Sequence, residues 1–209
     1  MPLHKEILSE EQVRLLPILQ RFKGEFGLVG GTAIALHIGH RESIDFGLFP
    51  KDPSAAFVPA KLRYRFSRGA LLGRVLVEED SELTFMTTSG VKITFYAFDY
   101  AMPFTEPFER WIDIPDLLTL AAMKAFALGS RAKWKDYVDL YFILKDHFSL
   151  EQISQRADEL FDLHFNAKLF REQLYFFDDM SHKEPVIFKP GFEVPEEDIK
   201  RALLQWSVS

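Results

Sequence analysis

The stretch GGTAIALHIGHRESIDF, residues 30–46, contains the residues that decide the fold. Its two glycines follow the short apolar run Phe26–Val29 and precede a helical pattern at Thr32–Ile38. A glycine pair between an apolar run and a helix is typical of a tight strand-to-helix turn. We expect Gly39 to cap the C-terminus of this helix, since glycine adopts the conformation that such caps need.

The residues after this helix alternate as a strand does. Over Ser43–Phe49 the side chains of Ile44, Phe46 and Leu48 point one way. The other face carries Ser43, Asp45, Gly47 and Phe49. A period of two predicts a strand with one apolar and one more polar face.

Farther along, the chain changes from strand patterns to helical patterns. The prolines between Met102 and Pro107 mark the change, so we divide the chain into residues 1–108, a mixed α/β core, and residues 109–209, a helical domain. This order predicts an α+β fold, with Ser89-Gly90 as a hairpin turn. Beyond 30–49 the expected strands are Arg74–Val77, Glu82–Thr87 and Val91–Phe98, and the expected helices are Ser9–Phe22, Asp116–Leu128, Lys133–Leu144, Ser149–Leu163 and Pro195–Trp206.

The composition is that of an ordinary globular protein, with 209 residues, a net charge of −6 and no cysteine. The lack of cysteine excludes disulfides, thiolate metal sites and cysteine nucleophiles. The acidic balance argues against a general nucleic-acid coat. The charged N-terminal stretch and the shortness of the longest uncharged run, Phe26–Ile38, predict a cytoplasmic protein without a signal peptide or membrane span.

The glycine turn and the strand after it could form a phosphate site. A glycine turn before a helix lets backbone N–H groups approach a phosphate closely. Asp45 could hold Mg²⁺ beside it, and Arg41 could neutralise charge. The alternative is an ordinary turn followed by a buried or capping aspartate.

A second group of charged residues lies in the helical half. Asp136 and Asp139 are three residues apart and share a helix face. Carboxylates beside several cations either contact a nucleotide or form a structural ion-pair network. The group consists of Lys124, Arg131, Lys133, Lys135, Asp136 and Asp139.

Together these motifs resemble a known family. GGTAIALHIGHRESIDF (30–46) and MKAFALGSRAKWKDYVDLYFIL (123–144) are similar to the AbiEii/AbiGii toxin family of nucleotidyltransferases, in particular its short bacterial members. GVKITF (90–95) and LYFFDD (174–179) extend the resemblance along most of the chain. The matching positions are Gly30, Gly31, Thr32, His40, Arg41, Ser43, Asp45, Lys92, Lys124, Arg131, Lys135, Asp136, Asp139, Leu140 and Tyr141.

The resemblance implies the fold of the DNA-polymerase-β nucleotidyltransferase superfamily, a mixed sheet with flanking helices followed by a helical domain. It also implies transfer of a nucleoside monophosphate from an NTP to an acceptor, with Mg²⁺. The implied partners are an NTP, a tRNA or other RNA acceptor and a cognate antitoxin, without a membrane. It implies catalytic roles for Asp45, Lys124 and Asp136, with Asp45 also as the metal ligand. The implied nucleotide or phosphate contacts are Gly30, Gly31, Thr32, Arg41, Ser43, Arg131, Lys135 and Asp139.

One position departs from the family pattern, which has a second aspartate where this chain has Gly47. Residues i and i+2 of a strand lie about 6.6–6.8 Å apart on one face, so two carboxylates placed there could hold two Mg²⁺ ions. Thr94 stands where the superfamily often has a third carboxylate. We therefore expect Mg²⁺ binding to be weak or lost unless another group compensates. Three hypotheses remain: an active nucleotidyltransferase, a catalytically degenerate member that binds nucleotide, RNA or a protein, and a structural protein whose motifs no longer serve a function.

Overall fold

The chain forms two compact units, which we call the sheet unit and the helical unit. The computed structural model describes residues 3–67, 71–128, 132–178 and 180–208. The sheet unit contains Leu8–Ala33 and Ser43–Asp116, and the helical unit contains Met1–Ile7, Ile34–Glu42 and Leu117–Ser209. The division of the chain at residues 108 and 109 stays a prediction.

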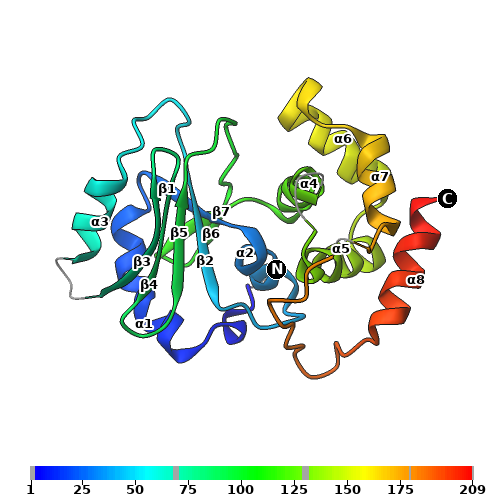
Figure 1. Cartoon of the computed structure of the whole chain (residues 1–209), viewed down its shortest axis with the longest axis horizontal. Coiled ribbons are helices and arrows are strands. Elements are labelled where there is room, and N and C mark those ends of the chain that lie inside the picture. The colour runs from blue at the N-terminus through cyan, green and yellow to red at the C-terminus, as the bar shows by residue number, and fades with distance from the viewer. Residues whose placement is uncertain (1–2, 68–70, 129–131, 179, 209) are drawn as a thin grey trace. The chain divides into compact units, whose positions relative to one another are not determined.

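A five-stranded mixed sheet is the centre of the sheet unit, with the strand order β1-β2-β5-β4-β3 (Figure 1). β2 pairs parallel with β5, and the other neighbours pair antiparallel. The parallel pair brings the start of β2 beside the start of β5. The strands are β1 (Phe26–Val29), β2 (Asp45–Pro50), β3 (Leu72–Glu79), β4 (Glu82–Thr87) and β5 (Lys92–Tyr96), and a separate hairpin consists of β6 (Glu106–Phe108) and β7 (Ile112–Ile114).

The two faces of the sheet differ because the side chains alternate along each strand. On β2 the residues Phe46, Leu48 and Pro50 are buried, whereas Asp45, Gly47 and Phe49 are partly exposed. The predicted alternation is thus confirmed over β2. Ile44 is an exception, since it precedes the strand and 62% of it is exposed.

Aromatic side chains fill the space between the apolar face and the helices that cover it. Phe22, in the 3-10 turn after α1 (Glu10–Leu19), stacks on Phe66 of α3 (Pro59–Ser67) with 5.0 Å between the ring centroids. Both rings also contact Phe95 of β5. The helix expected from Ser9 is confirmed and begins with a capping box. α3 carries the basic side chains of Lys61, Arg63 and Arg65.

The helical unit follows the predicted pattern of amphipathic helices closely. The helix expected from Ser149 begins with a capping box, and Gly39, expected as a helix C-cap, ends α2 with a φ of 78°. Among the α-helices described for this unit, α7 lacks a counterpart in the expected helices. The α-helices described in the helical unit are α4 (Leu117–Leu128), α5 (Trp134–Asp146), α6 (Leu150–Phe161), α7 (Ala167–Tyr175) and α8 (Glu196–Ser207). α2 (Gly30–Ile38) begins in the sheet unit and ends in the helical unit.

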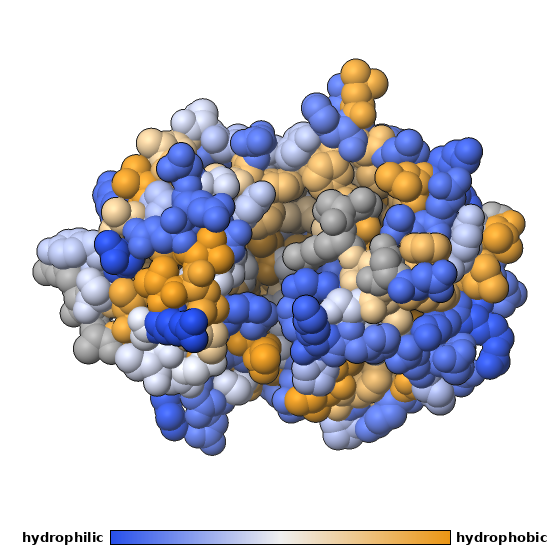
Figure 2. Space-filling view, in the orientation of Figure 1, coloured by the Kyte–Doolittle hydropathy of each residue, from blue (hydrophilic) through white to orange (hydrophobic). Residues whose placement is uncertain are grey.

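The α+β prediction is confirmed by this arrangement of a mixed sheet, flanking helices and a helical C-terminal part. Hydrophilic side chains dominate the face drawn in Figure 2, although an orange patch lies over the part of the view that holds the strands. Leu76 of β3 is one of the exposed apolar side chains of this unit. Within the described residues, the structure contains no helix of the length and apolarity needed to cross a bilayer.

Candidate active site

The predicted strand-to-helix turn lies between β1 and α2. β1 ends at Val29, α2 begins at Gly30, and Gly30 has a φ of 74°. This left-handed conformation favours glycine over residues with a side chain. A Cβ atom at Gly30 would meet nothing within 4 Å, so the backbone here is open to a ligand. The N–H groups of a first helical turn lack partners within their helix and suit an anion.

Two hydroxyl groups join this turn to β2. The Thr32 hydroxyl donates to the backbone carbonyl of Asp45, and the Ser43 hydroxyl donates to Thr32 at 2.7 Å. Both side chains are buried. Thr32 and Ser43 therefore hold Asp45 beside the N-terminus of α2, and their predicted phosphate contacts stay predictions.

Asp45 is the first residue of β2 and points to the partly exposed face of the sheet. Its register partner on β5 is Lys92, and the Lys92 ammonium lies 2.8 Å from an Asp45 carboxylate oxygen. The exposed fractions of the two side chains are 23% and 31%. The carboxylate is thus oriented by one cation and remains accessible to a ligand.

Hydroxyl groups adjoin Gly47 where the family pattern has its second aspartate. Thr94 is the register partner of Gly47, and its hydroxyl donates to Thr84 of β4 at 2.9 Å. The Thr84 hydroxyl in turn donates to Glu82 Oε1 at 2.6 Å. A Cβ at Gly47 would lie 3.6 Å from the Val29 carbonyl oxygen, an ordinary contact, so the backbone can accept an aspartate there.

These donors fit one Mg²⁺ ion better than two. Mg²⁺ is often held by one or two carboxylates together with substrate phosphates and water. Asp45 supplies one carboxylate, and neither Gly47 nor Thr94 adds a second. Across the described parts of the chain, no group of three or more histidine or acidic side chains forms a metal-binding cluster.

The helical unit contains a buried polar network centred on Asp139 of α5. Asp139 Oδ1 accepts hydrogen bonds from Arg41 Nε at 2.7 Å and from His40 Nε2 at 2.8 Å. Arg41 Nη2 donates to Oδ2 at 2.8 Å, and Lys124 Nζ lies 3.0 Å from the same oxygen. Lys124 also donates to Asp136 Oδ1 at 2.6 Å. Two anions and two cations therefore neutralise one another around a histidine.

Burial and charge act in opposite directions on this network. Burial raises the pKa of the Asp139 carboxyl, but the charges of Arg41 and Lys124 and the hydrogen bonds from His40 and Arg41 hold that pKa well below its usual range. Burial lowers the pKa of His40, and Asp139 only partly opposes this. Asp139 therefore stays ionised while His40 is neutral at pH 7. The residues of the network are at most 4% exposed, as expected of a structural ion-pair network.

Lys135, predicted to contact a nucleotide, is paired with Glu184. Lys133 donates to Glu184 Oε1 at 2.6 Å, and Lys135 forms an ion pair with Oε2. Burial raises the pKa of the Glu184 carboxyl, but the two lysines outweigh it and lower that pKa to about 2. The backbone of Ser181 fixes this segment by bonding to Ala132 and Trp134 at the start of α5.

The predicted site residues fall into two groups. Gly30, Gly31, Thr32, Ser43 and Asp45 come together in the sheet unit. Arg41, Lys124, Asp136 and Asp139 come together in the helical unit, with Lys135 on the same helix as the two acids. Arg131 lies outside the described residues.

Sequence reasoning missed the partners of these residues. Lys92 was noted only as part of a motif, because a parallel strand register cannot be read from spacing. Glu184 was not singled out at all, and His40 was noted only as part of a motif. A lone acid 49 residues after Lys135 gave no signal in the sequence.

A family model and a relative each match most of the chain. Residues 14–205 match a family model described as nucleotidyl transferase AbiEii toxin, type IV toxin–antitoxin system. An uncharacterized protein of Aquifex aeolicus is 28% identical over 189 residues, which is 87% of this chain and 88% of that protein.

Two solved structures share the fold at low sequence identity. JHP933 from Helicobacter pylori superposes with a TM-score of 0.60 and 17% identity, covering 96% of this chain and 92% of that one. MenT4, a nucleotidyltransferase toxin from Mycobacterium tuberculosis, has a TM-score of 0.59 and 13% identity, with coverage of 94% and 85%. At these identities the likeness shows the fold.

Proposed function

Because the chain belongs to the AbiEii family of nucleotidyl transferase toxins, we propose that it transfers a nucleoside monophosphate from an NTP to an acceptor. The observation that carries the proposal is the position of Asp45. Its carboxylate is partly exposed on the sheet, and Thr32 holds its backbone beside the N-terminus of α2. The helix N-terminus proposed to bind an anion and the acid proposed to bind a metal thus lie at one end of β2.

The chemistry is an in-line displacement at the α-phosphorus of the NTP. A hydroxyl oxygen of the acceptor forms the new P–O bond, the α–β phosphoanhydride bond breaks, pyrophosphate leaves and the hydroxyl proton passes to a base or water. Catalysis of this kind depends on positioning and on neutralising phosphate charge. The N–H groups at Gly30 and Gly31 would hold phosphate oxygens, and Lys92 adds positive charge at Asp45.

Asp45 is the residue that would hold Mg²⁺, which when bound with the nucleotide would neutralise the triphosphate and favour departure of pyrophosphate. With Gly47 in place of the second aspartate, this face of the sheet has one carboxylate fewer to help activate the acceptor hydroxyl. We therefore expect a slow enzyme rather than a fast one. The resemblance implies catalytic or nucleotide-binding roles for Lys124, Asp136 and Asp139. In our proposal they would support the reaction by keeping the helical unit folded, because they are buried in one ion-pair network.

Transfer of labelled nucleotide tests the proposal. Each of the four α-³²P-labelled NTPs is incubated with the protein, Mg²⁺ and total tRNA, and labelled RNA is resolved on a gel. We expect label from at least one NTP, and a loss of about 100-fold or more in Asp45→Asn. Asp80→Asn, in the exposed turn between β3 and β4, is the matched control. Failure of all four NTPs both to react and to bind would reject the proposal.

The second candidate function is a catalytically degenerate member that only binds its ligands. The observation that favours it is the glycine at position 47. An aspartate would fit there without a clash, yet the natural chain has none. Gly47→Asp restores the family pattern, and Gly47→Asn has nearly the same size without the charge. Activity that occurs in Gly47→Asp alone would identify the natural chain as a binding module. Activity of the natural chain that Asp45→Asn abolishes would identify it as an enzyme.

Membership of a toxin–antitoxin family also bears on partners. We expect a cognate antitoxin protein, an RNA acceptor such as a tRNA end, and action in the cytoplasm, where NTPs occur. Induced expression should slow growth, and Asp45→Asn should relieve this effect while the protein is produced at the same level.

A further inference from the structure

Aromatic side chains gather on the same sheet face as Asp45, at the other end of the same strands. Phe49 follows Asp45 by four residues on β2, and Tyr96 follows Lys92 by four on β5. The ring centroids of Phe49 and Tyr96 lie 5.9 Å apart. Phe98 stacks on Phe49 at 4.5 Å, and Tyr100 adjoins Phe98 at 5.3 Å. We call Phe49, Tyr96, Phe98 and Tyr100 the aromatic row.

On this face of β2, a glycine lies between Asp45 and the aromatic row. Gly47 lies midway along β2, is partly exposed and has no side chain between Asp45 and Phe49. Four residues of a strand span about 13 Å. Of the row, Tyr96 is 39% exposed, and Phe49 is partly exposed. A ligand that extends from Asp45 along β2 would therefore reach aromatic rings with accessible surface.

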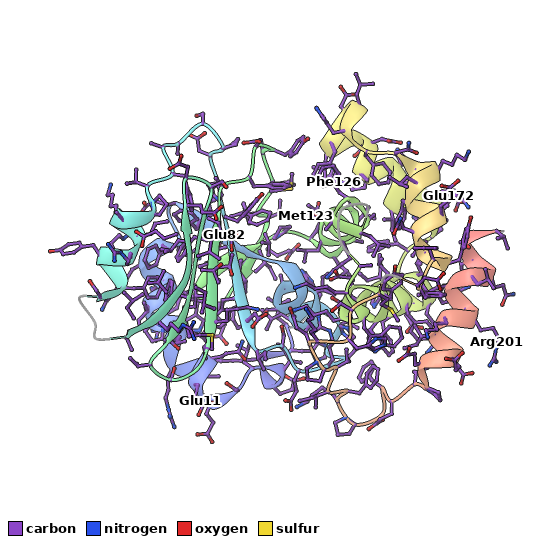
Figure 3. All side chains as sticks on the ribbon, viewed as in Figure 1. Glu11, Glu82, Met123, Phe126, Glu172 and Arg201 are labelled. Atoms are coloured by element: carbon purple, nitrogen blue, oxygen red, sulfur yellow. The ribbon has the colours of Figure 1, made fainter. Side chains whose placement is uncertain are left out.

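A fixed carboxylate adjoins the row. Glu82 of β4, labelled in Figure 3, is the register partner of Tyr96, so the two side chains share a face. Thr84 donates to Glu82 Oε1 and thereby orients the carboxylate. The matching occupant is flat and apolar on its faces and carries N–H donors at its edge, which describes an unpaired nucleobase. The negative charge disfavours a phosphate at the same place.

The reaction geometry decides which base comes here. Val29 pairs with Gly47, so α2 begins at the Asp45 end of β2, where the proposed phosphate contacts would receive the pyrophosphate that leaves. In an in-line displacement the attacking oxygen comes from the side opposite the leaving group. The acceptor therefore approaches Asp45 from the direction of Gly47 and Phe49.

We infer that Phe49 and Tyr96 form a stacking platform for the unpaired base at the 3′ end of an RNA acceptor, with Glu82 accepting hydrogen bonds from the edge of that base. The inference rests on the proposed function, because it places the acceptor of that reaction. It assigns Phe49, Tyr96 and Glu82 as acceptor-binding residues and keeps Asp45 for the nucleotide and metal.

Binding of short RNA in EDTA tests the inference without catalysis. The probe is a 5′-fluorescein-labelled single-stranded RNA hexamer, measured by fluorescence anisotropy against the full-length protein. Tyr96→Ala should weaken binding roughly 5- to 150-fold, the effect of one lost stacked base. Tyr96→Phe should bind as the natural chain does. Tyr64→Ala is the matched control, because Tyr64 is 62% exposed on α3, away from the sheet face.

A modified RNA makes the test independent of protein variants. A hexamer whose 3′-terminal nucleotide is abasic should bind the natural protein as weakly as the intact hexamer binds Tyr96→Ala. Glu82→Ala should reduce the differences in affinity among hexamers that end in A, C, G or U. Equal binding of intact and abasic hexamers, or no effect of Tyr96→Ala, would overturn the inference.

The outcomes separate this inference from the proposed function. Transfer of label that depends on Asp45, with an acceptor KM unchanged in Tyr96→Ala, rejects the platform and leaves the enzyme. RNA binding that depends on Tyr96 in a protein that neither binds nor transfers an NTP supports the platform and rejects the enzyme. Loss of antitoxin binding in Tyr96→Ala, with RNA binding unchanged, would assign the row to a protein interface and reject the platform.

Discussion

Asp45 and Asp139 are two aspartates that the family pattern marks as functional, and their surroundings differ in every respect that matters for chemistry. Asp45 has a partly exposed side chain and an ion pair with Lys92. Asp139 is fully buried and accepts hydrogen bonds from His40 and Arg41 while Lys124 lies beside it. A carboxylate that is to meet a ligand must remain accessible, whereas one with four donors is saturated. On this difference rests our proposal that Asp45 acts on the substrate, whereas Asp139 holds the helical unit together.

The largest effect that tests this comparison is on stability. Asp139→Ala leaves the charges of Arg41 and Lys124 buried without their anion, and we expect it to lower the free energy of unfolding by about 3–5 kcal/mol. Urea denaturation monitored by circular dichroism measures this. Asp146→Asn, half-exposed at the end of the same helix, is the control and should change little. A cost below about 1 kcal/mol for Asp139→Ala would contradict a structural role.

Glu184 provides an intermediate case, because it is paired by two lysines but partly exposed. Its pKa is about 2 in the folded protein and 4.5 when unperturbed, so its contribution is complete above pH 4.5 and is lost as the pH falls toward 2. About a third of its side chain is exposed, and we therefore expect only about 1–2 kcal/mol.

A double-mutant cycle isolates the Glu184 contribution. Glu184→Gln and Lys133→Gln should destabilise the protein at pH 6 by less in combination than the sum of the two single changes. The difference between the natural chain and Glu184→Gln should shrink between pH 4.5 and 2.5. A difference that is constant over this range would show that the ion pairs do not stabilise the fold.

His40 sharpens the comparison through its protonation. Burial lowers the pKa of His40, so the unfolded chain binds a proton that the folded chain does not. Stability should therefore fall as the pH decreases below 6.5, with a His40 contribution of at most about 1.4 kcal/mol per pH unit. Unfolding at pH 7.5, 6.5 and 5.5 in the natural chain and in His40→Gln measures it. His164→Gln, in an exposed 3-10 turn, should leave the pH dependence of the free energy of unfolding unchanged. An unchanged pH dependence in His40→Gln would show that His40 is not its source.

The smallest expected effect is on the stability of the sheet unit. Lys92→Met removes the partly exposed ion pair with Asp45, and such pairs contribute about 1 kcal/mol or less. Its free energy of unfolding should stay within that range, while binding of Mg²⁺–NTP should weaken because positive charge is lost at the phosphate site. A destabilisation as large as that of Asp139→Ala would remove the distinction between the two aspartates.

The sequence predicted the local secondary structure well, but it did not predict which charged side chains pair with one another. The glycine turn, the alternation of β2 and the capping boxes at Ser9 and Ser149 are local signals, and the structure has each of them. Ile44 was placed on the apolar face although it precedes the strand and is exposed. The pairings of Asp45 with Lys92 and of Lys135 with Glu184 depend on tertiary packing, which spacing does not encode.

The central claim is that Asp45, at the start of β2, binds the nucleotide together with its metal. Calorimetric titration of the protein with each of the four α,β-methylene NTPs in the presence of Mg²⁺ tests this claim. We predict that at least one of these analogues binds the natural chain and that Asp45→Asn weakens its binding about tenfold or more, with unchanged stability in urea. Equal affinity in the two proteins, or binding of none of the four analogues, would contradict the account.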